Sequence, residues 1–137
     1  MKMNDLELVY DFRQDQVKID QLQKATIETE EFGIVPEHGL IGTSEWWEAI
    51  EAGQITTDYI DGVISYLSEN MSDWPVFEID DGNEKSQWTC VATNKDLWNL
   101  YQVEKKARVR YAIQKAKSDY LGIGPEFKFV LEIWIEK

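Results

Sequence analysis

The strict alternation of apolar and polar residues near the C-terminus is the feature that most constrains the fold. In KARVRYAIQK (residues 106–115), the apolar face holds Val109, Tyr111 and Ile113, and the other face holds Arg108, Arg110 and Gln114. In EFKFVLEIWIEK (residues 126–137), one face holds Phe127, Phe129, Leu131, Ile133 and Ile135. A period of two predicts two β-strands, each with one buried face. The connection SDYLGIGPE is longer than a tight turn.

Earlier segments predict further strands. Residues 5–12 alternate as well, with Leu6, Leu8, Tyr10 and Phe12 on one face and Glu7, Val9 and Asp11 on the other. ITTDYIDGVISYLS predicts a hairpin that turns at Asp61-Gly62, a favoured two-residue turn. WPVFEIDDGNEKSQWTCVA predicts a second hairpin with its turn at residues 81–83, followed by a return strand lined by Trp88, Cys90 and Ala92.

Helices are fewer in this sequence. GTSEWWEAIEAG predicts a helix capped by Ser44 and ended by a left-handed Gly53, over which Ile55 packs. Residues 14–31 fit a short helix followed by an extended piece, with an apolar face made of Ile19, Leu22, Thr26 and Ile27. TNKDLWNLYQV fits one helical turn capped by Asn94, with Leu97, Trp98 and Tyr101 facing inward.

Strands therefore outnumber helices, and most strands are neighbours in the sequence. This order predicts an α+β fold, a mainly antiparallel β-sheet of about five to seven strands with one or two helices packed on one face. The 137 residues suit a single domain, residues 1–137, that needs neither disulfides nor a metal for stability.

Composition excludes several classes of protein. No segment has the apolar length of a membrane span, and the N-terminus lacks the apolar run of a signal peptide, so we expect a cytoplasmic protein. A net charge of −12 repels nucleic acids and anionic lipids, and it attracts basic partners. The bases gather toward the C-terminus, where Lys105–Lys117 contains no acid. We expect the carboxylates of Glu132 and Glu136 on the next strand to pair with them.

No residue pattern indicates catalysis, so we expect a protein that is not an enzyme and has no catalytic residues. His38 is the only histidine and has no triad signature around it, and Cys90 alternates with Trp88 as a buried thiol would. No zinc motif is present, and DDGNEKSQW lacks the ligand order of a calcium loop, so a hairpin turn explains it better. Gly122-Ile123-Gly124 precedes a proline rather than a helix and indicates no phosphate site. We therefore expect neither metal nor cofactor.

Two functions remain after these exclusions. Paired carboxylates and tryptophans occur in carbohydrate-binding sites, so a small-ligand or carbohydrate-binding domain that uses exposed Trp residues is one alternative. However, Trp46 and Trp47 point about 100° apart on a helix and cannot form one flat platform. One of them is then a core residue and the other lies at the rim. The other function is a non-catalytic acidic protein that binds a basic partner.

One region resembles a known class of proteins. GLIGTSEWWEAIEAGQI, followed by YIDGVISYLSENMSDWPVFEIDDG, is similar to small bacterial immunity proteins of polymorphic and contact-dependent growth-inhibition toxin systems. The shared elements are a Gly-x-x-Glu-Trp-Trp helix that ends at Gly, Asp/Glu-Gly-x-Ile opening a strand, and Asp-Trp/Tyr-Pro-x-Phe-Glu-Ile. The match covers residues 39–82. The resemblance implies a protein that binds a cognate toxin in the cytoplasm and blocks its active site or nucleic-acid channel.

Nuclease toxins are often basic, so an acidic inhibitor would gain association rate from electrostatic steering. Charge and expected exposure then place the partner-binding surface on two segments, the Trp-Trp helix and the 78–84 hairpin. The candidate residues are Glu45, Glu48, Glu51, Glu78, Asp80, Asp81 and Glu84.

Overall fold

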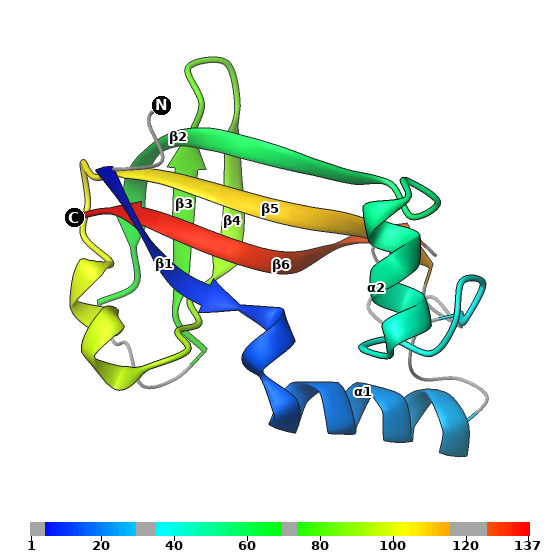
Figure 1. The fold of residues 1–137 in the computed structure, drawn as a ribbon. Helices are drawn as coiled ribbons and strands as arrows, with labels where there is room; N and C mark the ends of the chain where they lie inside the picture. The colour runs from blue at the N-terminus through cyan, green and yellow to red at the C-terminus, as the bar shows by residue number, and fades with distance from the viewer. Residues whose placement is uncertain (1–4, 30–34, 70–73, 116–125) are drawn as a thin grey trace. The chain divides into compact units, whose positions relative to one another are not determined.

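The computed structural model describes residues 5–29, 35–69, 74–115 and 126–137, without the side chains of residues 126 and 127. Its centre is a six-stranded sheet with the strand order β1-β6-β5-β2-β3-β4 (Figure 1). The strands are β1 (Leu6–Asp11), β2 (Thr57–Leu67), β3 (Val76–Asp80), β4 (Lys85–Thr89), β5 (Lys106–Lys115) and β6 (Glu126–Glu136). The helices are η2 (Phe12–Gln14), α1 (Gln16–Glu28), α2 (Ser44–Glu51) and η3 (Lys95–Leu100). The predicted α+β class is confirmed.

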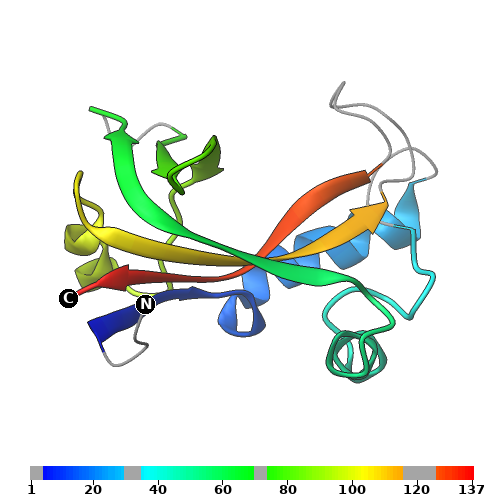
Figure 2. The same ribbon diagram turned by 90° about the horizontal axis from the view of Figure 1, so that it is seen from above.

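Neighbouring strands pair antiparallel at both edges of the sheet, β1 with β6 and β3 with both β2 and β4. The long strands β2, β5 and β6 are adjacent in the sheet, as the view from above shows (Figure 2). The chain divides into two compact units, and each contains part of these long strands. The first unit comprises residues 1–11, 59–110 and 132–137, and the second comprises residues 12–58 and 111–131.

The core of the first unit forms on one face of its strands. Phe77 and Ile79 of β3 are fully buried, as is Ile64 of β2. Tyr101, which ends η3, packs its ring 5.2 Å from that of Phe77. The Tyr101 hydroxyl donates to the backbone oxygen of Val91 at 2.6 Å, so this buried polar group is satisfied.

The core of the second unit is aromatic. The ring of Phe12 lies 5.8 Å from that of Trp46 and 4.8 Å from that of Phe129, both in edge-to-face contacts. Ile19 of α1 is buried beside Gly42, where a Cβ would lie only 2.7 Å from the Ile19 side chain. Gly42 therefore allows the segment before α2 to approach α1 closely.

The predicted hairpin at Asp61-Gly62 is wrong, because β2 runs without interruption from Thr57 to Leu67. Gly62 serves a different purpose. A Cβ at this position would lie 2.3 Å from the backbone oxygen of Asp80 on β3. The glycine is therefore required for close approach of two strands rather than for a turn.

Strict alternation fails in two strands. The register of β1 against β6 shifts between Leu8 and Tyr10, so Val9 and Tyr10 are both buried while Leu8 is exposed. A β-bulge of this kind cannot be read from a period of two. In β5, Tyr111 and Ala112 are both buried, which leaves Ile113 exposed and Gln114 buried, the reverse of the prediction.

The helix predictions need smaller corrections. Helix α1 runs from Gln16 to Glu28 and so takes up most of residues 14–31, where a short helix followed by an extended piece is predicted, and Ile27 is exposed. Thr43, not Ser44, is the N-cap of α2. The Asn94 cap of η3 and the buried Tyr101 are confirmed, although Leu97 and Trp98 are only half-buried.

The hairpin of β3 and β4 is confirmed, with its turn at residues 81–84 and Gly82 at a φ of 96°. Trp88 and Cys90 are buried, but β4 ends at Thr89, so Cys90 and the half-buried Ala92 both follow the strand instead of lining it. The predicted connection SDYLGIGPE, including Gly122 and Gly124, lies outside the described residues apart from Glu126, which begins β6. The side chain of Phe127 is likewise not described, whereas Phe129, Leu131, Ile133 and Ile135 are buried as predicted.

Candidate functional site

Helix α2 is held in place by both of its ends. The Thr43 side chain accepts a hydrogen bond from the backbone N–H of Trp46, which satisfies one of the free donors at the helix start. Gly53 takes a φ of 77°, and the backbone N–H groups of Gln54 and Ile55 donate to the carbonyl of Ala49. Ile55 is buried, as the sequence predicts for a residue that packs over a left-handed cap.

Only one of the two adjacent tryptophans belongs to the core. Trp46 is 1% exposed, and its indole N–H donates to the Oε1 of buried Gln114 at 3.2 Å. Trp47 is half-buried, and the Arg13 guanidinium lies 4.2 Å from the centre of its ring. The two indole planes meet at 81°, so no ligand can stack on both rings. The prediction of one core and one rim tryptophan is confirmed.

The three candidate acids of α2, Glu45, Glu48 and Glu51, are all exposed. Glu51 faces Arg13 at 3.7 Å, an exposed ion pair that contributes little to stability. Within the described part of the chain, neither Glu45 nor Glu48 forms an ion pair. These two carboxylates therefore contribute negative charge that the described residues do not neutralise.

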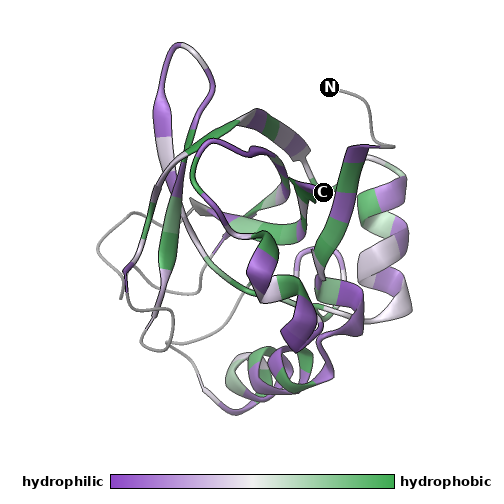
Figure 3. Ribbon diagram, turned by 90° about the vertical axis from the view of Figure 1, so that its left-hand side faces the viewer, coloured by the Kyte–Doolittle hydropathy of each residue, from purple (hydrophilic) through white to green (hydrophobic). Residues whose placement is uncertain are grey.

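The four candidate acids of the β3–β4 hairpin differ in their surroundings. Glu78 and Asp80 are half-buried on β3, whereas Asp81 and Glu84 are exposed in the polar turn (Figure 3). The Asp80 carboxylate accepts from the backbone N–H of Gly82 at 2.9 Å. The Asp81 carboxylate accepts from the N–H groups of Glu84 and Asn83, and these bonds lower the pKa of Asp81. Asp80 and Asp81 thus help to shape the turn.

The seven candidates fall into two groups. The α2 acids belong to the second unit, and the hairpin acids belong to the first. Each group is brought together by its own element of secondary structure. Their role in binding stays a prediction.

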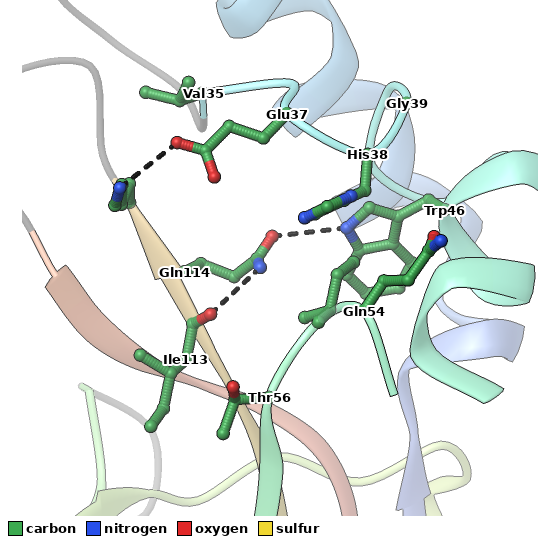
Figure 4. A pocket seen from close by; sticks show the side chains of 11 residues that line it. Val35, Glu37, His38, Gly39, Trp46, Gln54, Thr56, Ile113 and Gln114 are labelled. Carbon is green, nitrogen blue, oxygen red and sulfur yellow. Dashed lines mark hydrogen bonds and ion pairs between the residues drawn. The ribbon is translucent and has the colours of Figure 1, made fainter. Parts of the chain in front are cut away.

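A small polar pocket of about 170 Å³ lies in the second unit and includes His38 (Figure 4). Its wall contains the buried pair of Trp46 and Gln114 and the ion pair of Glu37 with Lys115 at 3.3 Å. Among the described residues, no group of three or more His, Cys, Asp or Glu side chains is placed to hold a metal ion. Cys90 is buried, and burial raises the pKa of its thiol to about 12, so the thiolate needed for nucleophilic chemistry does not form at neutral pH.

A comparison with protein families identifies the family of this chain. The family model of immunity protein RhsI2 matches residues 6–136, nearly the entire chain and both compact units. The chain belongs to the RhsI2 family of immunity proteins. A search of curated proteins found no match. As an immunity protein, it has a cognate toxin as its partner.

The RhsI2 match extends the resemblance seen at residues 39–82 to both ends of the chain. Immunity proteins act by binding and neutralising a toxin and are generally not enzymes. In the described parts of this RhsI2-family chain, no helix combines the length and apolar character that crossing a membrane requires.

The basic residues of β5 in this RhsI2-family protein are largely used within the molecule. Arg110 pairs with Glu132 at 2.9 Å, which confirms the predicted cross-strand contact. Arg108 instead binds both carboxylate oxygens of Asp61 on β2, at 2.5 and 3.1 Å. Glu136 accepts from the backbone N–H of Lys106 rather than from a side chain of the basic run.

Sequence reasoning missed three exposed apolar residues on β2, Tyr59, Val63 and Tyr66. A turn was predicted at Asp61-Gly62, so the alternation of exposed and buried residues was not followed from one side of the glycine to the other. The available signal was the continuation of β-branched and aromatic residues on both sides of Gly62.

Proposed function

We propose that this chain neutralises its toxin by binding a basic surface of the toxin through exposed carboxylates. The observation that carries the proposal is the state of Glu45 and Glu48 on α2, which are exposed and outside every ion pair among the described residues. The net charge of −12 adds a long-range attraction for a basic partner. Glu84, exposed in the β3–β4 turn, extends the same chemistry to the first unit.

Binding of this kind occludes the toxin without chemistry on it. Electrostatic attraction speeds the encounter, while a few well-packed side chains supply most of the affinity. Glu51, Asp80 and Asp81 stay within the proposed surface, but they are poor test positions because Arg13 or the hairpin turn already engages them. Glu78 accepts from the Ser65 hydroxyl at 2.8 Å and is held in place on β3.

The first test is co-expression of this chain with the toxin domain encoded immediately upstream. Rescue of growth together with co-purification of the two chains is the expected result. The proposal is wrong if the toxin stays toxic and forms no complex although this chain is soluble and folded.

The second test measures association kinetics of the triple variant Glu45→Lys, Glu48→Lys and Glu84→Lys. Reversing these three negative charges should slow association of the chain with the toxin by about tenfold or more at low salt. The effect should be smaller at high salt, where charges are screened. The control is the pair Asp20→Lys and Glu28→Lys on α1, which reverses exposed acids elsewhere. Equal slowing in both variants would mean that net charge matters but that the proposed surface does not.

A further inference from the structure

The strands of the first unit have one buried face and one face that is open to solvent. Ile64 of β2 lies opposite Ile79 of β3, and both are fully buried. Val63 lies opposite Asp80, and Tyr66 lies opposite Glu78, after a bulge between Ile64 and Tyr66. Residues opposite one another share a face, so Val63, Tyr66, Glu78 and Asp80 lie on the open side of the sheet.

Three large apolar side chains are exposed along β2, which is unusual for a strand in the middle of a sheet. The exposed fractions are 51% for Tyr59, 39% for Val63 and 49% for Tyr66. Tyrosine is enriched in protein interfaces because its ring buries much area while its hydroxyl stays hydrogen-bonded. We call Tyr59, Val63 and Tyr66 the β2 stripe.

The charges around the β2 stripe are arranged for a cationic partner. Arg108, which lies 5.2 Å from the centre of the Tyr59 ring, is already paired with Asp61. Glu78 and Asp80 lie opposite Tyr66 and Val63, and neither forms an ion pair among the described residues. Lys85 faces Asp80 across β3 and β4 without pairing with it in the structure.

Beside the stripe the surface is hollowed. A depression of about 610 Å³ is lined by Val63 and Val103 together with Asp80, Asp81 and Glu104, and its lining includes no base from the described parts of the chain. Val103 is itself 49% exposed. A long side chain with an aliphatic stem and a cationic head matches these walls, because the valines contact the stem and the carboxylates contact the head.

We infer that the β2 stripe and the adjoining depression form the docking face for the toxin, with a lysine or arginine of the toxin seated in the depression. This inference rests on the proposed function, since it names the side chains that anchor the same partner. The stripe supplies apolar contact area, and the carboxylates select a partner that presents both apolar groups and positive charge. Acids alone would speed the encounter without holding the complex.

The test measures the equilibrium dissociation constant of the purified complex for Tyr66→Ala and Tyr59→Ala, with the folding of each variant checked by circular dichroism and thermal unfolding. We expect Tyr66→Ala to weaken binding by about 30-fold or more, the usual loss at an anchor residue. Val63→Arg, which places a cation beside Asp80 at the depression, should weaken it at least as much.

The matched controls are Val17→Ala and Ile27→Ala, which remove apolar side chains that are 69% exposed on α1. These should change the dissociation constant less than twofold. If the stripe variants fold and bind like the controls while the Glu45, Glu48 and Glu84 reversals still slow association, this inference is wrong and the proposed function stands. If the unmodified chain does not bind the toxin at all, both are wrong.

Discussion

Replacing Trp46 by alanine tests how the second unit is held together. Trp46 is 1% exposed and packs edge-to-face against Phe12 and Phe129. Removing a buried Trp side chain costs about 3–5 kcal/mol, through lost transfer free energy and the cavity left behind. Globular proteins typically have a free energy of unfolding of about 5–15 kcal/mol, so the variant loses a large part of it.

A hydrogen bond adds a second contribution. The indole N–H of Trp46 donates to Gln114, whose side chain is buried. Without that donor the Oε1 of Gln114 is left unpaired, at a cost of about 1–3 kcal/mol. Trp46→Phe tests the contribution of this hydrogen bond, because the phenyl ring keeps much of the buried volume but has no N–H donor. Combining it with Gln114→Leu should recover part of the loss, since both partners are then apolar.

Urea unfolding followed by far-UV circular dichroism measures these differences without relying on the fluorescence of a mutated tryptophan. The control is Trp47→Ala, because Trp47 is only half-buried and contacts Arg13 at the surface. We expect its loss of stability to be well below that of Trp46→Ala. Equal losses for the two variants, or an unchanged midpoint for Trp46→Ala, would refute the assignment of Trp46 as the core residue.

Two further predictions concern the first unit. Gly62→Ala should destabilise the protein by about 1–3 kcal/mol in the same unfolding assay, because the new Cβ would overlap the backbone oxygen of Asp80; an unchanged midpoint would mean that β2 and β3 can separate there at no cost. Cys90, whose folded pKa is raised to about 12 by burial, should not react with a thiol reagent at pH 8 until the chain unfolds. Because the folded state holds this proton more tightly, the thiol's contribution to stability is complete below the unfolded pKa of about 9 and is lost as the pH rises toward 12. Rapid labelling of the native protein, or stability that does not fall through this range in comparison with Cys90→Ala, would contradict the burial of the thiol.

The local part of the fold could be predicted because its signals are local. Helix α2 depends on a cap, an apolar face and Gly53, all within a dozen residues, and the β3–β4 turn depends on Asp81 and Gly82. The alternation predicted for β6 is retained, because Phe129, Leu131, Ile133 and Ile135 are all buried. The negative net charge and the lack of catalytic motifs could also be read from the sequence, and together they predicted a binding protein.

The candidate site could be predicted only in part from local sequence signals. Exposure of Glu45, Glu48 and Glu51 follows from the helical period, so these residues could be proposed directly. The ion pair of Arg110 with Glu132 was predicted, whereas that of Arg108 was not, because Arg108 contacts Asp61, a residue 47 positions away, rather than an acid on β6. The β2 stripe was missed because Asp61-Gly62 predicted a turn, although β-branched and aromatic residues continue on both sides of the glycine.

The sequence by itself determined the secondary-structure types, the negative charge and the tryptophan helix, because each follows from the properties of residues close together in the chain. Tertiary structure alone decided that Trp46 rather than Trp47 is buried and that Gly62 allows the backbone of Asp80 to approach closely. It also decided that a bulge interrupts the alternation of β1 and that Ala112 and Gln114 of β5 are buried while Ile113 is exposed. These outcomes depend on which distant segments pack together, and packing of distant segments is a property of the folded chain and not of any short stretch within it.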